Sequence, residues 1–134
     1  MSAAIAGDRS AALAFYREQL QRDVDLADDE ELLLERDGGA VIAAVRLAPG
    51  HGTLELRTMV VDRRHQRAGI GSRLLARAGR AIGDRECYCL CWSYLEGFYG
   101  QVGFVRVDET TLPEFLRERF ASSQDQIAMR RAPR

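Results

Sequence analysis

The sequence contains no lysine, so all 19 of its Lys-plus-Arg side chains are arginine. Without lysine, the chain can neither form a Schiff base through an ε-amino group nor place a P-loop lysine on a phosphate. Histidine is scarce as well, and neither His51 nor His65 lies in a recognised metal-ligand pattern. These shortages exclude Schiff-base and P-loop chemistry, and we expect no metal site.

Cysteine is nearly as scarce. The three cysteines, Cys87, Cys89 and Cys91, alternate within one short apolar stretch, so on a strand they face the same side. Neighbours at that spacing on an extended strand are badly placed for a disulfide, and their number is odd. We therefore expect reduced cysteines packed in a core.

Long apolar runs are missing too. The longest, at residues 40–45, falls far short of the roughly 20 residues that cross a bilayer, and no basic-then-apolar leader opens the chain. The net charge of −1 gives little support for general nucleic-acid binding. We expect no membrane partner, no nucleic-acid partner and a cytoplasmic location.

What is present suits one folded domain. The 134 residues are 46% hydrophobic and 29% charged, with no repeated or low-complexity segment. A chain of this length can bury most of its apolar side chains around a single core. We expect a single domain over residues 1–134.

Hydrophobic periodicity predicts an α/β (α+β) chain with interleaved helices and strands. Helices are expected at residues 8–21, 74–82, 94–102 and 112–120. Strands are expected at residues 3–6, 32–36, 40–47, 53–61, 86–92, 103–107 and 125–131. An Asp-Gly turn joins the second and third of these strands as a hairpin. Because strands 53–61 and 86–92 flank a helix, we expect them to be parallel neighbours.

Two finer expectations concern the strand at 53–61 and the segment at 23–31. Because successive side chains of a strand point to opposite faces, the side chains of this strand form two sets. One side carries Glu55, Arg57, Met59 and Val61. The other side carries Leu54, Leu56, Thr58 and Val60. The segment at 23–31 is too acidic for a core, so we expect a solvated connection.

The segment Gln66 to Ser72 sets Gly69 and Gly71 one residue apart, just before an apolar helical pattern. Two glycines can serve a tight turn, or they can let a ligand approach free N–H groups at a helix start. A Rossmann loop is excluded because Leu74 stands where the third small residue belongs. A Walker loop is excluded by spacing and by the lack of lysine.

The stretch around this loop resembles the signature region of the GNAT superfamily of N-acetyltransferases. Its Q/R-x-x-G-x-G/A motif is matched by Gln66, Gly69 and Gly71. A second family segment, an aromatic pair followed by Gly-Phe, is matched by the pairs at 98–99 and 103–104. The resemblance covers nearly the whole chain. It implies a mixed, mostly antiparallel central sheet of six to seven strands with about four helices, splayed between strands 53–61 and 86–92 by a bulge in the first.

The resemblance implies acetyl-CoA as the acyl donor. Its pyrophosphate would lie on the main-chain N–H groups of the glycine loop. The loop residues are Gln66, Arg67, Ala68, Gly69, Ile70, Gly71 and Ser72. The pantetheine arm would extend along the strand end, and a main-chain N–H near the bulge would face the thioester carbonyl. The strand-end residues are Met59, Val60 and Val61, and Phe98 completes the cofactor-binding set.

Nearby arginines are candidates for the phosphates of CoA, or they face solvent. They are Arg63, Arg64, Arg67 and Arg73. The chain departs from the family pattern at Trp92, where an asparagine is frequent, and this tryptophan would alter or narrow the acceptor pocket.

Two residues are candidates for proton transfer. Tyr99 occupies the place of the family's general acid, the alternative being a packed aromatic beside Phe98. Glu55 lies where some members carry the carboxylate that accepts the amine's proton, directly or through water. Its alternative is an exposed residue paired with Arg57 or Arg46.

The expected function is transfer of an acetyl group from acetyl-CoA to a primary amine, by direct attack in a ternary complex. The alternative is a non-catalytic acyl-CoA-binding sensor or regulatory module. The acceptor is undetermined, and the acidic segment 23–31 would attract a cationic amine unless it is only a solvated loop. The chain is expected to be a monomer or a homodimer, with edge strands such as the final one able to pair with a second subunit.

Overall fold

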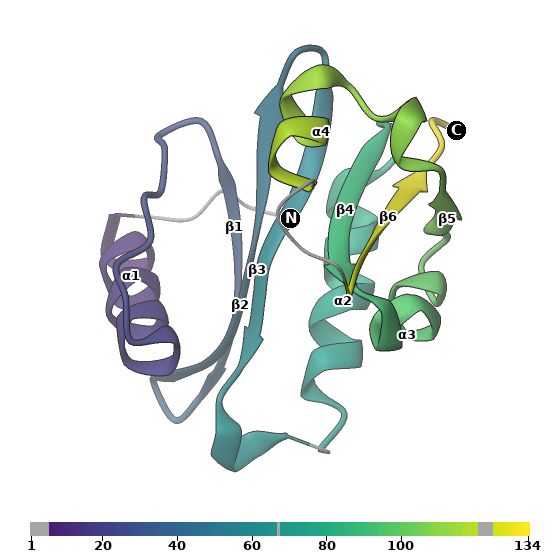
Figure 1. The fold of residues 1–134 in the computed structure, drawn as a ribbon. Coiled ribbons are helices and arrows are strands. Elements are labelled where there is room, and N and C mark those ends of the chain that lie inside the picture. Colours follow the sequence, from purple (N-terminus) through teal and green to yellow (C-terminus); the bar gives the residue numbers. More distant parts are fainter. Residues whose placement is uncertain (1–5, 67, 121–124) are drawn as a thin grey trace.

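A mixed six-stranded sheet in the order β1-β2-β3-β4-β6-β5 forms the centre of the molecule in a computed structural model (Figure 1). The structure describes residues 6–66, 68–120 and 125–134. The strands are β1 (Glu31–Asp37), β2 (Ala40–Gly50), β3 (Thr53–Val61), β4 (Cys87–Trp92), β5 (Val105–Val107) and β6 (Gln126–Arg131). The α-helices in this part of the chain are α1 (Ala6–Leu20), α2 (Ile70–Ile82), α3 (Glu96–Gly100) and α4 (Glu114–Phe120). All neighbouring strands are antiparallel except β3 and β4, which are parallel as predicted.

Two layers of helices cover the two faces of this sheet. The apolar stripe of α2 packs on one face, where Leu74, Leu75 and Ile82 join the largest core cluster with the three cysteines. On the opposite face, Tyr16 of α1 and Leu116 of α4 belong to two smaller clusters. The buried, reduced cysteines confirm the sequence prediction. Among the described residues, no helix is long and apolar enough to cross a membrane.

The β1–β2 hairpin forms where the sequence predicts it. Gly38 and Gly39 have φ angles of +58° and +97°, which residues with a Cβ rarely adopt. This turn conformation matches the right-handed twist of the two strands. The expected first strand at 3–6 falls mostly outside the described residues, and α1 already includes Ala6.

A β-bulge at Thr58 overturns the predicted alternation of β3. Ala44 faces Val60 and Arg46 faces Arg57, so two residues of β3 lie opposite one residue of β2. Thr58 has a φ of +54°, which is unfavourable for a β-branched residue. The extra residue reverses the sides that follow, and Met59 therefore packs on the same core cluster as the residues before the bulge. Leu54, Leu56 and Val61 contact this cluster as well.

The bulge coincides with the separation of β3 from β4. The two strands pair from Leu54 opposite Cys87 to Leu56 opposite Cys89, and the pairing ends there. Beyond that point they diverge toward their carboxyl ends, as the lower part of Figure 1 shows. The splay implied by the family resemblance is thus present in the fold.

One prediction about the surface is wrong, and another is confirmed only in part. The final strand, β6, is not at the sheet edge, because the three-residue β5 pairs along its outer side. The segment 23–31 is mostly solvated, but Val24 and Glu30 turn inward and are buried. Glu30 can be buried because an arginine of β2 neutralises its charge.

Candidate active site

The glycine loop opens directly into α2. Gly69 is the N-cap residue of this helix with a φ of +77°, and the first helical bond runs from the Arg73 N–H to its carbonyl oxygen at 3.0 Å. Since glycine has no side chain to cap a helix, the first N–H groups of α2 keep no partner from the cap. These groups, together with the helix dipole, can bind an anion at this point.

A groove of about 410 Å³ runs beside this loop. Its lining comprises Met59, Val61, His65, Gln66, Gly69, Gly71, Ser72, Tyr94, Leu95, Phe98 and Tyr99. A Cβ added at Gly71 would lie 3.5 Å from Val61 Cγ2 and 3.6 Å from Phe98 Cζ, both ordinary contacts. The position therefore has room for a Cβ, and a longer side chain would fill the groove only if it pointed into it.

Most of the predicted cofactor-binding residues line this groove. They are Met59, Val61, Gln66, Gly69, Gly71, Ser72 and Phe98. Val60 instead packs with the α1 cluster, because the bulge turns it to the opposite face. Ile70 is buried in the core, Ala68 is exposed outside the lining, and Arg67 lies outside the described residues.

Two of the candidate arginines around the loop are engaged with carboxylates. Arg73 Nε lies 2.8 Å from Glu35 Oε1, and Arg64 Nη2 lies 3.0 Å from Asp62 Oδ2. Hydrogen bonds from the side chain and main chain of Arg64 hold the pKa of Asp62 well below its usual range. Arg63 is exposed. A phosphate would have to compete with these carboxylates for Arg64 and Arg73.

A second cavity, of about 550 Å³, lies at the splay between β3 and β4. It is lined by Leu20, Arg22, Glu55, Leu56, Arg57, Thr58, Met59, Val60, Cys89, Leu90, Cys91, Trp92, Leu95, Tyr99, Arg119 and Gln126. Met59, Leu95 and Tyr99 line both this cavity and the groove beside the glycine loop. The two spaces therefore meet at these three side chains.

Tyr99 sits at the junction of the two spaces. Its ring packs edge-on against Phe98 and Phe104, with centroids 5.0 and 6.1 Å apart, and only 4% of the residue is exposed. Burial, together with the neighbouring Cys89 and Cys91 thiols, raises the pKa of Tyr99 well above its usual value. The phenol therefore stays protonated at neutral pH.

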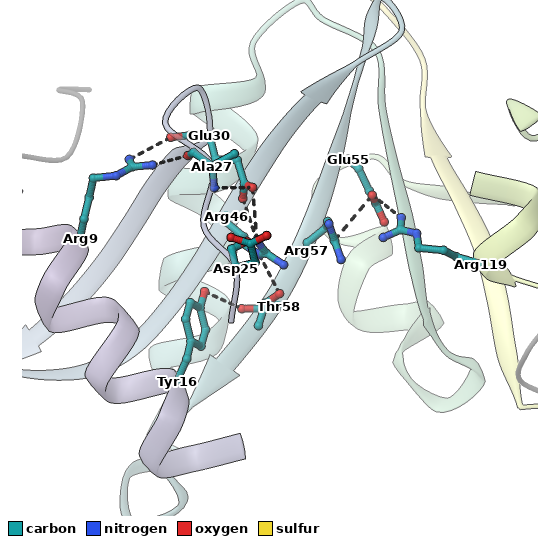
Figure 2. Close-up of polar contacts among 10 residues, drawn as sticks. All are labelled: Arg9, Tyr16, Asp25, Ala27, Glu30, Arg46, Glu55, Arg57, Thr58 and Arg119. Atoms are coloured by element: carbon teal, nitrogen blue, oxygen red, sulfur yellow. Dashed lines mark hydrogen bonds and ion pairs between the residues drawn. The ribbon is translucent and has the colours of Figure 1, made fainter. Parts of the chain in front are cut away.

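Glu55 reaches the cavity from β3. Its side chain is only 7% exposed, so the expected exposed alternative is wrong. Its Oε1 atom lies 3.7 Å from Arg57 Nε and forms a second ion pair with Arg119 Nη2 of α4 (Figure 2). The pairing with Arg57 was anticipated from the sequence, whereas Arg46 pairs elsewhere.

A buried network holds the bulge next to this cavity (Figure 2). The Tyr16 hydroxyl donates to the Thr58 carbonyl oxygen at 2.8 Å, and Arg46 Nε donates to Thr58 Oγ1 at 2.9 Å. Arg46 Nη1 also donates to the Asp25 carbonyl oxygen at 2.7 Å and to Glu30 Oε1 at 3.0 Å. The Arg46 and Glu30 side chains are 5% and 7% exposed, so both charges depend on this pairing.

Sequence reasoning missed several residues of this site. The one signal was Arg46, a charge inside the apolar strand pattern of β2. No local pattern marks Arg22, Arg119 or Tyr16, which distant elements bring to the splay. His65 also lines the groove, and its buried Nδ1 has no hydrogen-bond partner among the described residues. In the same part of the chain, no cluster of three acidic, histidine or cysteine side chains could hold a metal ion.

Comparisons with solved structures find the same fold over nearly the whole chain. An acyl-CoA N-acyltransferase from Pseudomonas aeruginosa is 24% identical with a TM-score of 0.73, over 96% of this chain and 93% of that one. Escherichia coli ElaA is 16% identical with a TM-score of 0.74, over 96% and 92%. An aminoglycoside 6'-N-acetyltransferase complexed with coenzyme A is 17% identical with a TM-score of 0.65, over 95% and 91%. Comparison with curated proteins finds no match.

A family model described as the acetyltransferase (GNAT) domain matches residues 28–106, which is more than half of the chain. This range runs from the acidic segment through the bulged strand, the glycine loop and Tyr99 to β5. The chain belongs to the GNAT acetyltransferase family, whose members transfer an acyl group from acetyl-CoA.

Proposed function

We propose that this chain, as one domain, transfers the acetyl group of acetyl-CoA to a primary amine by direct attack of the amine in a ternary complex. The observation that carries the proposal is the position of Tyr99, which lines both the groove beside the glycine loop and the cavity at the splay. One bound molecule in each space would meet at this side chain. Coenzyme A in a structure of similar fold supports acetyl-CoA as the donor.

The donor would occupy the groove. The first N–H groups of α2 lack a capping side chain, and they would bind the pyrophosphate as helix starts bind other anions. Met59 and Val61 would face the pantetheine arm, since the bulge turns both toward the groove. A main-chain N–H at the bulge would stabilise the negative charge that develops on the thioester oxygen.

Tyr99 would act on the leaving sulfur. Because burial keeps the pKa of this phenol above its ordinary value, its O–H is present at neutral pH and can donate to the sulfur as the C–S bond breaks. Cys87 and Cys89 are poor candidates for an acyl-enzyme. Burial raises the pKa of Cys87 to about 12, and a hydrogen bond with Cys91, together with burial, raises the pKa of Cys89, which disfavours a thiolate at both positions.

Glu55 would receive the acceptor amine. Its carboxylate lines the cavity, and the ion pairs with Arg57 and Arg119 fix its position. It would accept the amine's proton directly or through water, so that the nitrogen attacks in its neutral form.

The test is a transfer assay on the purified chain with acetyl-CoA and a panel of primary amines. CoA thiol release and the acetylated amine, identified by mass spectrometry, are followed together. The proposal expects both products in equal amounts. Tight acetyl-CoA binding with no acetylated amine from any acceptor would refute it and leave a non-catalytic acyl-CoA sensor.

A further inference from the structure

The cavity at the splay carries an excess of positive charge. Its described lining contains three arginines from three separate elements and one carboxylate, Glu55. Arg57 comes from β3, Arg119 from α4, and Arg22 from the segment after α1. Within the described lining, one carboxylate faces three guanidinium groups, so the lining has a net positive charge that suits an anionic ligand.

Arg57 is the clearest case. Its Nε lies 3.7 Å from Glu55 Oε1, which is too long for a hydrogen bond, and its side chain is 36% exposed. Partial burial lowers the pKa of Arg57, and the Arg119 and Arg46 charges lower it further against the opposing effects of Glu55 and Glu30. A second anion beside this guanidinium would relieve the desolvated charge.

The acidic segment 23–31 does not supply that anion to the cavity. Glu30 is buried against Arg46, Glu31 pairs with Arg85 at 2.8 Å, and Asp23 pairs with Arg17. Asp29 and Glu30 line a neighbouring groove of about 420 Å³, which shares Glu55, Arg57 and Arg119 with the cavity, but neither lines the cavity itself. Three of the six carboxylates in this segment are therefore paired with arginines outside the cavity.

We propose that the acceptor is a small amine that carries its own anionic group, as an α-amino acid does. Glu55 would hold the ammonium end, and Arg57, with Arg22 and Arg119, would hold the carboxylate. The inference rests on the proposed acetyltransferase function and replaces the cationic acceptor expected from the sequence. A cavity of about 550 Å³ has the size of a small-molecule site.

The reaction balances without any further reactant. The amine, after losing one proton toward Glu55, attacks the thioester carbonyl carbon, so that an N–C bond forms and the C–S bond breaks. Tyr99 donates a proton to the leaving sulfur, which becomes the CoA thiol. The nitrogen loses its second proton, which restores the Tyr99 hydroxyl, and becomes a neutral amide, while Glu55 returns its proton to water. The anionic group keeps its charge throughout and stays paired with the arginines.

The test compares acceptors that differ only in this charge. CoA release is measured with the standard L-amino acids, with the α-carboxamide of each amino acid that reacts, and with spermidine. We expect kcat/KM to be at least about tenfold higher for the carboxylate than for its carboxamide, mainly through KM. The α-amine of a carboxamide loses its proton more readily than the α-amine of the free amino acid. This difference favours the carboxamide as an acceptor, so it works against the expected result.

A pair of arginine variants localises the effect. Arg22→Gln should raise the KM of the carboxylate acceptor about threefold to tenfold and leave the KM of acetyl-CoA unchanged. Arg80→Gln is the matched control, because Arg80 is exposed on α2 and lines neither the groove nor the cavity. Equal or better use of spermidine or the carboxamides would overturn the inference and leave the acetyltransferase function standing. Failure to acetylate any amine would overturn both.

Discussion

The groove beside the glycine loop and the cavity at the splay present different chemical groups to a ligand. The groove presents main-chain N–H groups and mostly apolar side chains, whereas the cavity presents four charged side chains, Arg22, Glu55, Arg57 and Arg119. Main-chain N–H groups suit a ligand that stays the same from one protein to another. Charged side chains can be substituted, so they suit ligands that differ. We infer that the groove serves the common donor and that the cavity determines the acceptor.

The largest effect is expected at Arg46, which holds the bulge beside the acceptor cavity. Arg46→Met should lower the free energy of unfolding by about 3–5 kcal/mol, because it leaves the buried Glu30 carboxylate without its partner. Urea denaturation measures this loss. Adding Glu30→Gln should restore more than half of it, and a loss below about 1 kcal/mol in the single variant would contradict the buried pairing.

Tyr99 lines both regions, and the variant Tyr99→Phe tests its role there. This change keeps the ring packed against Phe98 and Phe104 but removes the hydroxyl. We expect kcat to fall about 100-fold to 1000-fold, with the Kd of acetyl-CoA unchanged. A kcat within about threefold of wild type would show that Tyr99 is only a packed aromatic.

A charge substitution at the start of α2 tests the donor side alone. In Gly71→Glu the carboxylate would repel the pyrophosphate, and the Kd of acetyl-CoA should rise about 100-fold. Gly71→Gln has the same size without the charge, and the space around Gly71 accepts a Cβ in both. If the two variants weaken binding equally, bulk alone accounts for the loss and the anion site is not supported.

The smallest expected effect concerns pH. Because the pKa of Tyr99 is raised above its usual value of about 10, the phenol keeps its proton as the pH rises from about 8 to about 10. At saturating acceptor, kcat should therefore show no alkaline decline in this range. A decline that disappears in Tyr99→Phe would mean that the phenol ionises near its ordinary pKa.

The sequence predicted what depends on local pattern. The β1–β2 hairpin, the α2 stripe, the cysteine strand and the glycine loop all follow from periodicity and turn residues. On these patterns alone the loop could be a turn or a ligand site. The cofactor groove and Tyr99 were both expected only through the resemblance of their segments to family motifs.

What failed depends on contacts between distant elements. The alternation of β3 was wrong because Thr58 adopts a conformation that its sequence does not favour, and Tyr16 and Arg46 stabilise it from α1 and β2. The cationic acceptor expected from segment 23–31 stays a prediction. Our proposal differs from it because Arg46 and Arg85, far along the chain, pair with Glu30 and Glu31, and because three other arginines line the cavity.

The division between the two regions is tested most directly by calorimetric titration of acetyl-CoA into wild type, Gly71→Glu and Arg22→Gln. The account predicts equal dissociation constants for wild type and Arg22→Gln, and a value about 100-fold higher for Gly71→Glu. Absence of binding to wild type would contradict it. So would an Arg22→Gln variant that is weakened as much as Gly71→Glu.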